Sequence, residues 1–243
     1  MMGDEALLRA RAESRGLEET VDHQLRDYGE CRLADIRANS VEDWPLAGAT
    51  HVRVRLPATV PNQVQMQARG YLLADRTLGA SIPLKRAKVD FQALIRLPAC
   101  RSEGHIEEIY EIARSSFPVD RRFHLAPLCD DPRLFERILR EWTRVLEAPF
   151  VCKIGGEVAG FLALTGLEEK KPFVHLAAVA ERFRMSGAAL SLYATAAASC
   201  QEAGFATLTG RISTSNLPAL NLYASLGASF SDPIDIFLRR EEP

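Results

Sequence analysis

The stretch Val179-Ala-Glu-Arg-Phe-Arg184-Met-Ser-Gly187-Ala-Ala189-Leu190 follows an apolar segment, Phe173-Val-His-Leu-Ala-Ala-Val179, and leads into a helix-like run. We interpret it as a strand, a tight turn and a helix N-terminus, with Gly187 where the backbone must come close to a ligand. The first amide N–H groups of a helix are unpaired and carry the positive end of the helix dipole, so such a terminus suits a pyrophosphate. The stretch therefore predicts a phosphate-binding loop.

A second segment carries polar residues at fixed spacing: Asn216-Leu-Pro-Ala219-Leu-Asn-Leu-Tyr223-Ala-Ser-Leu-Gly227-Ala-Ser-Phe230. It resembles the N-x-x-A-x-x-x-Y-x-x-x-G-F/A segment of the GNAT N-acetyltransferase superfamily. The spacing Arg184-x-x-Gly187-x-Ala189 likewise resembles the R/Q-x-x-G-x-G/A loop with which these enzymes bind coenzyme A. Both motifs occur in the order found in the superfamily, so together they indicate a GNAT acetyltransferase.

The hydrophobic pattern of residues 91–243 supports the α/β fold that this resemblance implies, in which helices flank a mixed central sheet. Apolar residues at helical spacing predict helices at Glu103–Phe117 and Pro132–Glu147, and the Gly155-Gly156 pair predicts a β-hairpin. The other expected elements are strands at Phe91–Pro98, Phe173–Val179, Ala206–Ile212 and Ile234–Leu238, and helices at Gly187–Gly204 and Leu217–Leu226. We therefore expect the GNAT acyl-CoA N-acyltransferase fold over 91–243.

Residues 1–90 form a smaller N-terminal α/β domain in this interpretation. Glu5–Asp35 has the pattern of one or two amphipathic helices, His51–Leu56 alternates as a half-buried strand does, and Pro61–Gly70 is typical of a short helix that ends in a glycine. Tyr71–Leu84 supplies one or two further strands. Strand, Asn, helix, Gly and strand follow one another here as they do near the C-terminus. This domain is therefore either a degenerate partial copy of the acetyltransferase or an unrelated α/β cap.

The composition of the chain excludes several classes of protein. Of 243 residues, 47% are hydrophobic and 26% are charged, and the formal net charge of -2 lacks the basic excess of a nucleic-acid-binding protein. No apolar run is long enough to span a membrane, and the first residues lack the apolar core of a signal peptide. Five cysteines without paired spacing predict reduced thiols in a cytoplasmic protein and no metal site. A homodimer is left open.

The resemblance also implies which residues bind acetyl-CoA, the cosubstrate. Backbone amides at the end of the predicted strand would face the thioester oxygen, and the loop with the helix start would hold the pyrophosphate. The expected set is Leu176, Ala177, Ala178, Val179, Arg184, Met185, Ser186, Gly187, Ala188, Ala189 and Asn216. Asn216 has a second interpretation, as the cap of the helix that begins at Leu217.

Acetyl transfer from a thioester to an amine needs a neutral amine and a proton donor for the leaving thiolate. Tyr223 fits the second need, because a phenol with a pKa of about 10 stays protonated at neutral pH, and the superfamily's tyrosine at this position is the proposed general acid. His175, on the strand before the loop, is a candidate base because histidine titrates near neutral pH. His124 and Glu181 are alternative bases, and packing roles for Tyr223 and His175 stay open.

The arrangement of the two predicted domains bears on the acceptor. A short N-terminal α/β domain before a GNAT domain resembles the dTDP-fucosamine acetyltransferases, which acetylate the amino sugar of a nucleotide-linked precursor. Arg122 and His124 lie after the first predicted helix and are expected to bind this acceptor, since an arginine suits the phosphates of a nucleotide. The alternatives are a GNAT acetyltransferase for another small amine or a protein N-terminus, and a non-catalytic acyl-CoA-binding module.

Overall fold

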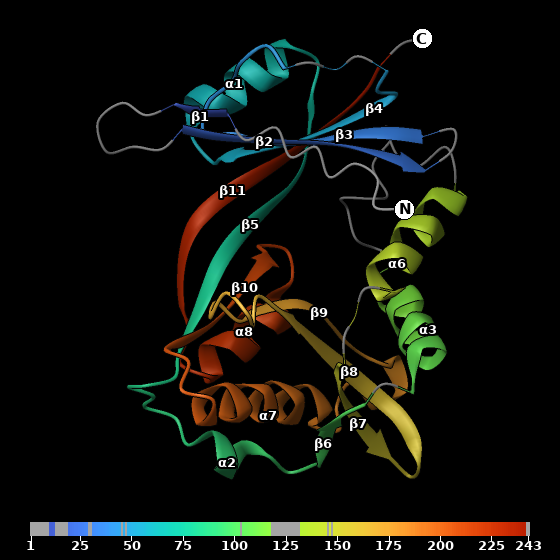
Figure 1. Ribbon diagram of the computed structural model, residues 1–243, viewed down its shortest axis with the longest axis vertical. Coiled ribbons are helices and arrows are strands. Elements are labelled where there is room, and N and C mark those ends of the chain that lie inside the picture. The colour runs from blue at the N-terminus through green and yellow to red at the C-terminus, as the bar shows by residue number, and fades with distance from the viewer. Residues whose placement is uncertain are drawn as a thin grey trace. The chain divides into compact units, whose positions relative to one another are not determined.

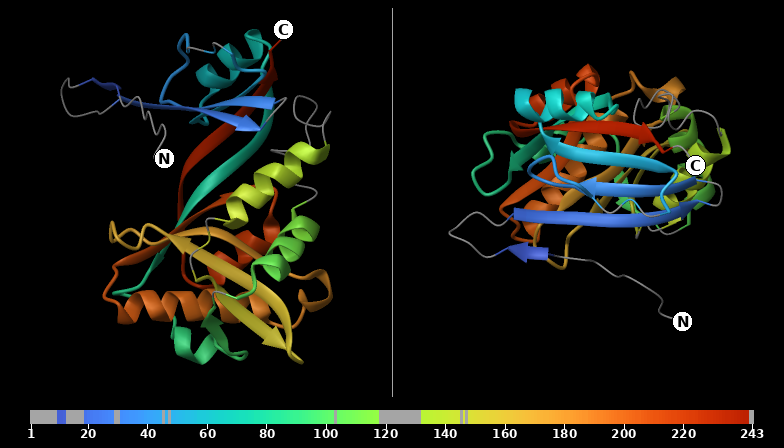
Figure 2. Two further views of the ribbon diagram at one scale, coloured as in Figure 1. Left: turned by 45° about the vertical axis from the view of Figure 1, so that its right-hand side comes forward. Right: turned by 90° about the horizontal axis from the view of Figure 1, so that it is seen from above.

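The computed structural model describes residues 10–12, 19–28, 31–44, 46, 48–102, 104–117, 132–144, 146 and 148–241. The chain divides into two compact units (Figures 1 and 2). The first unit consists of Met1–Thr77, Asp120–Phe135 and Asp232–Pro243, and the second consists of Leu78–Val119 and Glu136–Ser231. The domain boundary near residue 90 that the sequence suggests stays a prediction.

The first unit is a sheet with one helix against it. Its strands are β1 (Ala10–Ala12), β2 (Glu19–Tyr28), β3 (Cys31–Arg37) and β4 (His51–Pro57), together with parts of β5 (Leu72–Pro83) and β11 (Ser229–Arg240). They lie in the order β1-β2-β3-β4-β11-β5. The β3–β4 pair is parallel, whereas β1–β2, β2–β3 and β4–β11 are antiparallel. Helix α1 (Val60–Ala68) follows β4, and its Met66 packs in an apolar core with Val54, Leu56 and Phe237.

The N-terminal strands correct one expectation from the sequence. The predicted helices in Glu5–Asp35 are wrong for the described part of that range, which forms β1, β2 and most of β3. Charged residues that suggested the exposed face of a helix lie in a sheet, where the carboxylate of Asp35 pairs with Arg53, eighteen residues later on β4. Local periodicity cannot show so distant a partner. By contrast, the predictions of β4, α1 and β5 are confirmed.

Asp35 lies at the centre of a buried ionic cluster in the first unit. Its side chain is only 6% exposed, and Arg53 binds both carboxylate oxygens, with distances of 3.0 Å from Nε to Oδ1 and 2.6 Å from Nη2 to Oδ2. Arg55 donates to Oδ2 at 3.0 Å. Burial by itself would raise the pKa of Asp35, but the positive charges of Arg53 and Arg55 outweigh it and lower the pKa to about 2. The ionised carboxylate therefore ties β3 to β4.

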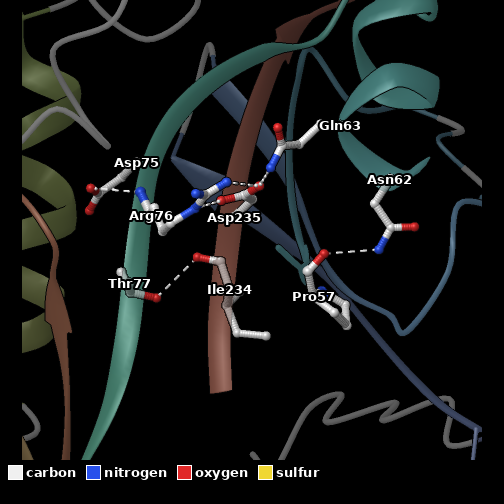
Figure 3. Close-up of polar contacts among 8 residues, drawn as sticks. All are labelled: Pro57, Asn62, Gln63, Asp75, Arg76, Thr77, Ile234 and Asp235. Atoms are coloured by element: carbon white, nitrogen blue, oxygen red, sulfur yellow. Dashed lines mark hydrogen bonds and ion pairs between the residues drawn. The ribbon is translucent and has the colours of Figure 1, made fainter. Parts of the chain in front are cut away.

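A second polar cluster joins α1, β5 and β11 within the first unit (Figure 3). Asp235 is fully buried, and Arg76 donates to both of its oxygens, at 2.6 Å from Nε and 3.0 Å from Nη2. Gln63 on α1 donates to the same carboxylate at 2.9 Å. Asn62 donates to the carbonyl of Pro57 at 2.9 Å, which fixes the start of the helix against the end of β4. Every oxygen of the buried carboxylate thus has a donor, as a buried charge requires.

The second unit has a larger sheet with helices on it. Its strands are β6 (Ala99–Arg101), β7 (Phe150–Ile154), β8 (Glu157–Thr165), β9 (Phe173–Val179) and β10 (Thr207–Ser213), with the remaining parts of β5 and β11. From β5 the order is β5-β10-β9-β8-β7-β6. The β9–β10 pair is parallel, and β6–β7, β7–β8 and β8–β9 are antiparallel. The sheet is therefore mixed, as the predicted fold requires.

The helices of the second unit are α2 (Phe91–Leu94), α3 (Ile106–Ser116), α6 (Pro132–Arg144), α7 (Ala188–Glu202) and α8 (Leu217–Ser225), with a short 3-10 turn at Glu181–Phe183. In α6, residues from Glu136 onward belong to this unit. Helix α7 contacts β7 and β8, while α3 contacts β8 and β9. The helices predicted from periodicity are thereby confirmed, as is the hairpin at Gly155 and Gly156, whose φ values of 60° and 86° suit a tight turn. In the described ranges, no helix has the length and apolarity needed to cross a membrane.

The strand predicted at Phe91–Pro98 is wrong, because this segment begins with the short helix α2. The carboxylate of Asp90 accepts a hydrogen bond from the Ala93 amide at 3.3 Å and so caps the helix. Further along, the amides of Arg96 and Leu97 donate to the buried hydroxyl of Ser191 on α7, at 3.2 and 3.1 Å. A side chain from a distant helix therefore satisfies the backbone groups that a strand would have paired in a sheet.

Candidate active site

Strands β9 and β10 are paired up to Val174 and Gly210 and then separate. The pairs recorded between them are Phe173 with Thr209 and Val174 with Gly210. Strand β9 continues to Val179, where it still pairs with β8. Among the described residues, the β10 side of β9 therefore has no ladder partner beyond Val174. Backbone N–H and C=O groups on such an edge need other partners, which a ligand between the strands can supply. We refer to this place as the strand opening.

The strand opening begins beside a β-bulge at His175. On β8, Ala163 and Leu164 are consecutive, but on β9 they oppose Leu176 and Val174, so His175 is the extra residue. A bulge bends its strand and redirects the neighbouring backbone groups. The predicted oxyanion donors Leu176, Ala177, Ala178 and Val179 follow directly after it.

His175 has an unusual environment for a titratable side chain. Its ring packs edge-on against Trp142 of α6, with ring centroids 6.5 Å apart. The Nε2 atom is buried, and no hydrogen-bond partner for it is present among the described residues. Burial lowers the pKa of His175 below its ordinary value of 6.5. The imidazole is therefore neutral at pH 7 and able to accept a proton.

The predicted phosphate loop lies between the end of β9 and the start of α7. Gly187 is the residue before the helix and has a φ of 84°, a conformation that only glycine adopts at little cost. No atom lies within 4 Å of a Cβ built there, so the space above it is open. The Ser186 hydroxyl accepts a hydrogen bond from the Ala188 amide at 3.2 Å and donates to the Phe183 carbonyl at 2.7 Å. Next to it, Met185 is 98% exposed.

This geometry fits an anionic group at the start of α7. The first turn of a helix has amides without internal partners, and the helix dipole adds positive potential there. The expected loop residues Arg184, Met185, Ser186, Gly187, Ala188 and Ala189 are consecutive around this turn. The structure thus brings them together, and their contact with coenzyme A stays a prediction.

Tyr223 reaches the strand opening from helix α8, on the side of β10. It is 2% exposed on α8, and its hydroxyl lies against Gly210, the last residue of β10 that pairs with β9. Its ring contacts that of Tyr193 on α7, with centroids 5.1 Å apart, and the two hydroxyls share a hydrogen bond. Burial, followed by the charge and hydrogen bond of Tyr193, raises the pKa of Tyr223 above its ordinary value. Tyr223 thus stays protonated at any ordinary pH.

His175 and the Tyr223 hydroxyl therefore lie at the same level along β9 and β10. His175 follows Val174, and Val174 pairs with Gly210, which the Tyr223 hydroxyl touches. The two side chains have different surroundings, since His175 packs on α6 and Tyr223 belongs to the apolar core that includes α7. A candidate base and a candidate acid thus flank one opening.

Several other predicted site residues have simpler placements. The Asn216 side chain accepts a hydrogen bond from the Ala219 amide at 3.1 Å, so the capping role is observed, and contact with the coenzyme stays a prediction. Glu181, an alternative base, is exposed in the 3-10 turn. Arg122 and His124 lie outside the described residues, so their predicted role with the acceptor stays untested. The described part of the chain has no group of three or more His, Cys, Asp or Glu side chains placed to hold a metal ion.

The sequence did not indicate two residues that touch Tyr223. Tyr193 is one of several small and aromatic residues within α7, and Gly210 is an isolated glycine in a strand pattern. An isolated strand glycine often marks a close approach, and this was the available signal for Gly210. Nothing in the pattern of α7 distinguishes Tyr193 from a packing residue.

One cavity in the second unit is separate from the strand opening. It has a volume of about 720 Å³ and lies at the far end of β8, where Leu164 and Thr165 line it with residues of α3 and of the turn after β8. Thr165 pairs with Phe173 at the start of β9, whereas the phosphate loop follows the end of β9 at Val179. The cavity therefore lies toward the opposite end of β9 from the phosphate loop.

The role of Gly187 can be tested at its own position. We expect Gly187→Val to raise the acetyl-CoA dissociation constant at least about tenfold, or about 1.4 kcal/mol, because a branched side chain fills the open space and strains a φ of 84°. Titration calorimetry measures this. Gly204→Val is the matched control, since Gly204 after the other end of α7 has a φ of 81° and equally open space. Equal losses of affinity in both variants would contradict a phosphate-binding role.

Comparison with known proteins agrees with this geometry. The sequence model of the acetyltransferase (GNAT) family matches residues 106–228, more than half of the chain. No curated protein shows significant similarity to the chain. A GCN5-related N-acetyltransferase from Sphaerobacter thermophilus has a similar structure, with a TM-score of 0.63 at 15% identity over 92% of this chain and 77% of the other.

Two further solved structures are similar. A functionally unknown conserved protein from Staphylococcus epidermidis ATCC 12228 has a TM-score of 0.66 at 9% identity, over 98% of this chain and 96% of that one. A glucosamine N-acetyltransferase region of a fungal multi-domain GH3 β-N-acetylglucosaminidase has a TM-score of 0.57 at 13% identity, over 91% of this chain and 31% of that one. At such identities the structures share the fold alone. The family match, however, spans the bulge, the loop and Tyr223, and the chain belongs to the acetyltransferase (GNAT) family.

Proposed function

We propose that this GNAT N-acetyltransferase transfers the acetyl group of acetyl-CoA directly to the amine of a nucleotide-linked amino sugar. The observation that carries the catalytic part is the position of Tyr223, whose hydroxyl lies at the residue pair where β9 and β10 separate. In this proposal Tyr223 is the general acid and His175 the general base. Bound acetyl-CoA supplies the thioester that is cleaved.

The loop supports binding of the coenzyme's pyrophosphate. Gly187 provides an open, backbone-lined surface, and the first turn of α7 provides amide donors and positive potential. The unpaired edge of β9 leads from this loop to His175. Among its residues Leu176–Val179, those whose N–H groups do not bond to β8 direct them at the carbonyl oxygen that gains charge during transfer.

Burial keeps the Tyr223 hydroxyl protonated before the transfer, and it also makes that hydroxyl a weaker acid. A phenol in water has a higher pKa than a thiol, about 10 against about 8.5, so donation to a free thiolate is slightly unfavourable there. A buried thiolate is also costly, as Cys200 on α7 illustrates, where burial raises the pKa of the thiol to about 11. In the proposal the Tyr223 proton passes to the leaving sulfur as its bond to the acyl carbon breaks, and the buried tyrosinate that remains regains a proton before the next turnover.

His175 makes the pH dependence of kcat a test of the base. Because its pKa is lowered from 6.5, the neutral imidazole persists below that pH and the acidic limb of kcat should lie below pH 6.5. Below the lowered pKa, kcat should fall about tenfold per pH unit as the imidazole is protonated. The profile is measured at saturating acceptor, which removes titration of the free amine. His175→Asn should abolish the limb, while His105→Asn on α3 should keep it; a limb that survives in His175→Asn would exclude His175 as the base.

Two similarities point to the class of acceptor. The resemblance to dTDP-fucosamine acetyltransferases suggests a nucleotide-linked amino sugar, and the fungal glucosamine N-acetyltransferase region is an enzyme of this fold with an amino-sugar acceptor. The alternatives remain another small amine, a protein N-terminus or a non-catalytic acyl-CoA-binding module. A buried tyrosine hydroxyl at the strand opening favours catalysis over the module, since binding alone needs no proton donor. A cytoplasmic location and a homodimer also stay predictions.

A panel of acceptors tests the proposal. Release of free coenzyme A thiol is measured with acetyl-CoA and, in turn, dTDP- and UDP-linked amino sugars, free glucosamine, amino acids and a peptide N-terminus. The highest kcat/KM is expected for a nucleotide-linked amino sugar. A higher value for a free amine or peptide would overturn the acceptor and keep the chemistry. Binding of acetyl-CoA without turnover of any amine would favour the binding module.

A further inference from the structure

The helix that carries Tyr223 has a counterpart in the first unit. Thr59 caps α1 by accepting a hydrogen bond from the Asn62 amide at 3.3 Å, as Asn216 caps α8. Each helix has a proline in its first turn, and each is followed by a glycine with a φ of 77°, Gly70 and Gly227. Because the cap and the glycine are equally far apart in both segments, α1 and α8 align without a gap.

In this alignment Tyr223 corresponds to Met66, which is fully buried in the core of the first unit. The strands before the two helices also correspond in their buried positions when one extra residue is allowed before α8, since Leu56 lies three residues before Thr59 and Ile212 lies four residues before Asn216. The last buried residue is Leu56 in β4 and Ile212 in β10. Two residues before it lie Val54 in β4 and Gly210 in β10. At these two corresponding positions the first unit has Val54 and Met66, whereas the second unit has Gly210 and Tyr223.

Gly210 is the residue that gives the Tyr223 hydroxyl its place. A Cβ built on Gly210 would overlap the Tyr223 hydroxyl oxygen and would come within 3.1 Å of Cζ, closer than real Cβ atoms normally come. A valine, as in the first unit, would displace the ring altogether. Glycine at this position therefore lets the hydroxyl reach the backbone of β10 at the strand opening, and nothing in its own backbone φ requires it.

Tyr193 fixes the same hydroxyl from the side of α7. The two rings meet edge to face at an interplanar angle of 73°. The Tyr193 hydroxyl also forms a hydrogen bond with the Tyr223 hydroxyl. Tyr193 on α7 and the backbone of Gly210 together restrict the position of the Tyr223 hydroxyl.

We propose that Gly210 and Tyr193 are positioning residues that hold the Tyr223 hydroxyl at the strand opening, and that the first unit, with Val54 and Met66 in the corresponding places, has no acetyl-transfer site. The inference rests on the proposed role of Tyr223 as general acid. It assigns one active site to each chain and explains why tyrosine and glycine occur together in only one of the two aligned segments.

Double-mutant cycles test the two positioning residues. Gly210→Ala and Tyr193→Phe are each expected to lower kcat at least about fivefold, with the KM for acetyl-CoA within about twofold, because the hydroxyl is moved or loses its partner. In the Tyr223→Phe background, which has no hydroxyl to position, neither change should lower kcat further. Gly79→Ala is the control, since a Cβ there meets its nearest atom at 3.4 Å, an ordinary contact.

The outcomes separate this inference from the proposed function. If Tyr223→Phe is fully active, the general acid is wrong and the inference falls with it. If Tyr223→Phe is impaired but Gly210→Ala and Tyr193→Phe keep wild-type kcat, the positioning roles alone are overturned. Additive losses in the double variants would also overturn them. Should Gly210→Ala fail to fold, the Tyr193→Phe cycle decides. Calorimetry of the wild-type protein should give one acetyl-CoA per chain, and two would overturn the single-site assignment.

Discussion

Replacing Tyr223 with phenylalanine is expected to lower kcat by about 10²–10⁴, the usual effect of removing one acid–base group. The substitution keeps the ring, which packs in the apolar core beside Tyr193, and removes only the hydroxyl that lies against Gly210. Because the loss concerns the proton given to the departing thiolate, binding of acetyl-CoA should change little. Steady-state kinetics at saturating substrates and calorimetry of acetyl-CoA binding measure the two quantities.

A matched tyrosine shows whether the effect is specific. Tyr110 on α3 is 3% exposed, and its ring stacks under the Arg140 guanidinium at 4.0 Å rather than at the strand opening. Tyr110→Phe should therefore leave kcat within about twofold of wild type, as expected of a change outside the site. Wild-type kcat in Tyr223→Phe would show that Tyr223 only packs α8 against the sheet.

Replacing Asp35 with asparagine is expected to lower the free energy of unfolding by about 3–5 kcal/mol. The variant keeps the shape of the side chain but removes the negative charge that pairs with the guanidinium of Arg53, which is 7% exposed. Arg55 loses the same carboxylate. Urea unfolding measures the change. The double variant Asp35→Leu/Arg53→Met should recover much of the loss, since removing a buried pair costs less than breaking it.

The pH dependence of the free energy of unfolding tests the same interaction of Asp35. Asp35 has a folded pKa of about 2, below the value of about 3.9 for an unfolded chain. Its contribution should be complete above about pH 4 and decline as the pH falls toward 2, where the carboxylate is protonated. Asp43, 99% exposed beside Arg69, is the control, and Asp43→Asn should cost at most about 1 kcal/mol. Equal losses in Asp35→Asn and Asp43→Asn would contradict the buried cluster.

Elements with strong local signals were predictable. The α7 segment has a glycine at its start, α8 has an asparagine cap and a proline in the first turn, and the β7–β8 hairpin has two glycines with positive φ. Each of these signals acts over a few residues: a cap accepts a hydrogen bond from a free backbone amide, and a glycine adopts the positive φ that a turn requires. The candidate loop and Tyr223 were found for this reason.

The predictions failed where distant residues satisfy polar groups. In β3 the Asp35 carboxylate needs Arg53 of β4, and after α2 the amides of Arg96 and Leu97 need the hydroxyl of Ser191 on α7. A periodicity argument assigns such charged or irregular stretches to exposed helices or simple strands. Tertiary contacts override that assignment because they provide partners that lie far away in the sequence.

The sequence by itself determined the family, the loop at the start of α7 and the identity of Tyr223 as a candidate acid, because motif spacing preserves residues that act through the local backbone. Only the tertiary structure decided that His175 is a bulged residue next to the last pair of β9 and β10, and that Gly210 and Tyr193 surround the Tyr223 hydroxyl. Strand register and the meeting of α7, α8 and β10 depend on packing between segments far apart in the chain. No short pattern in the sequence records those contacts.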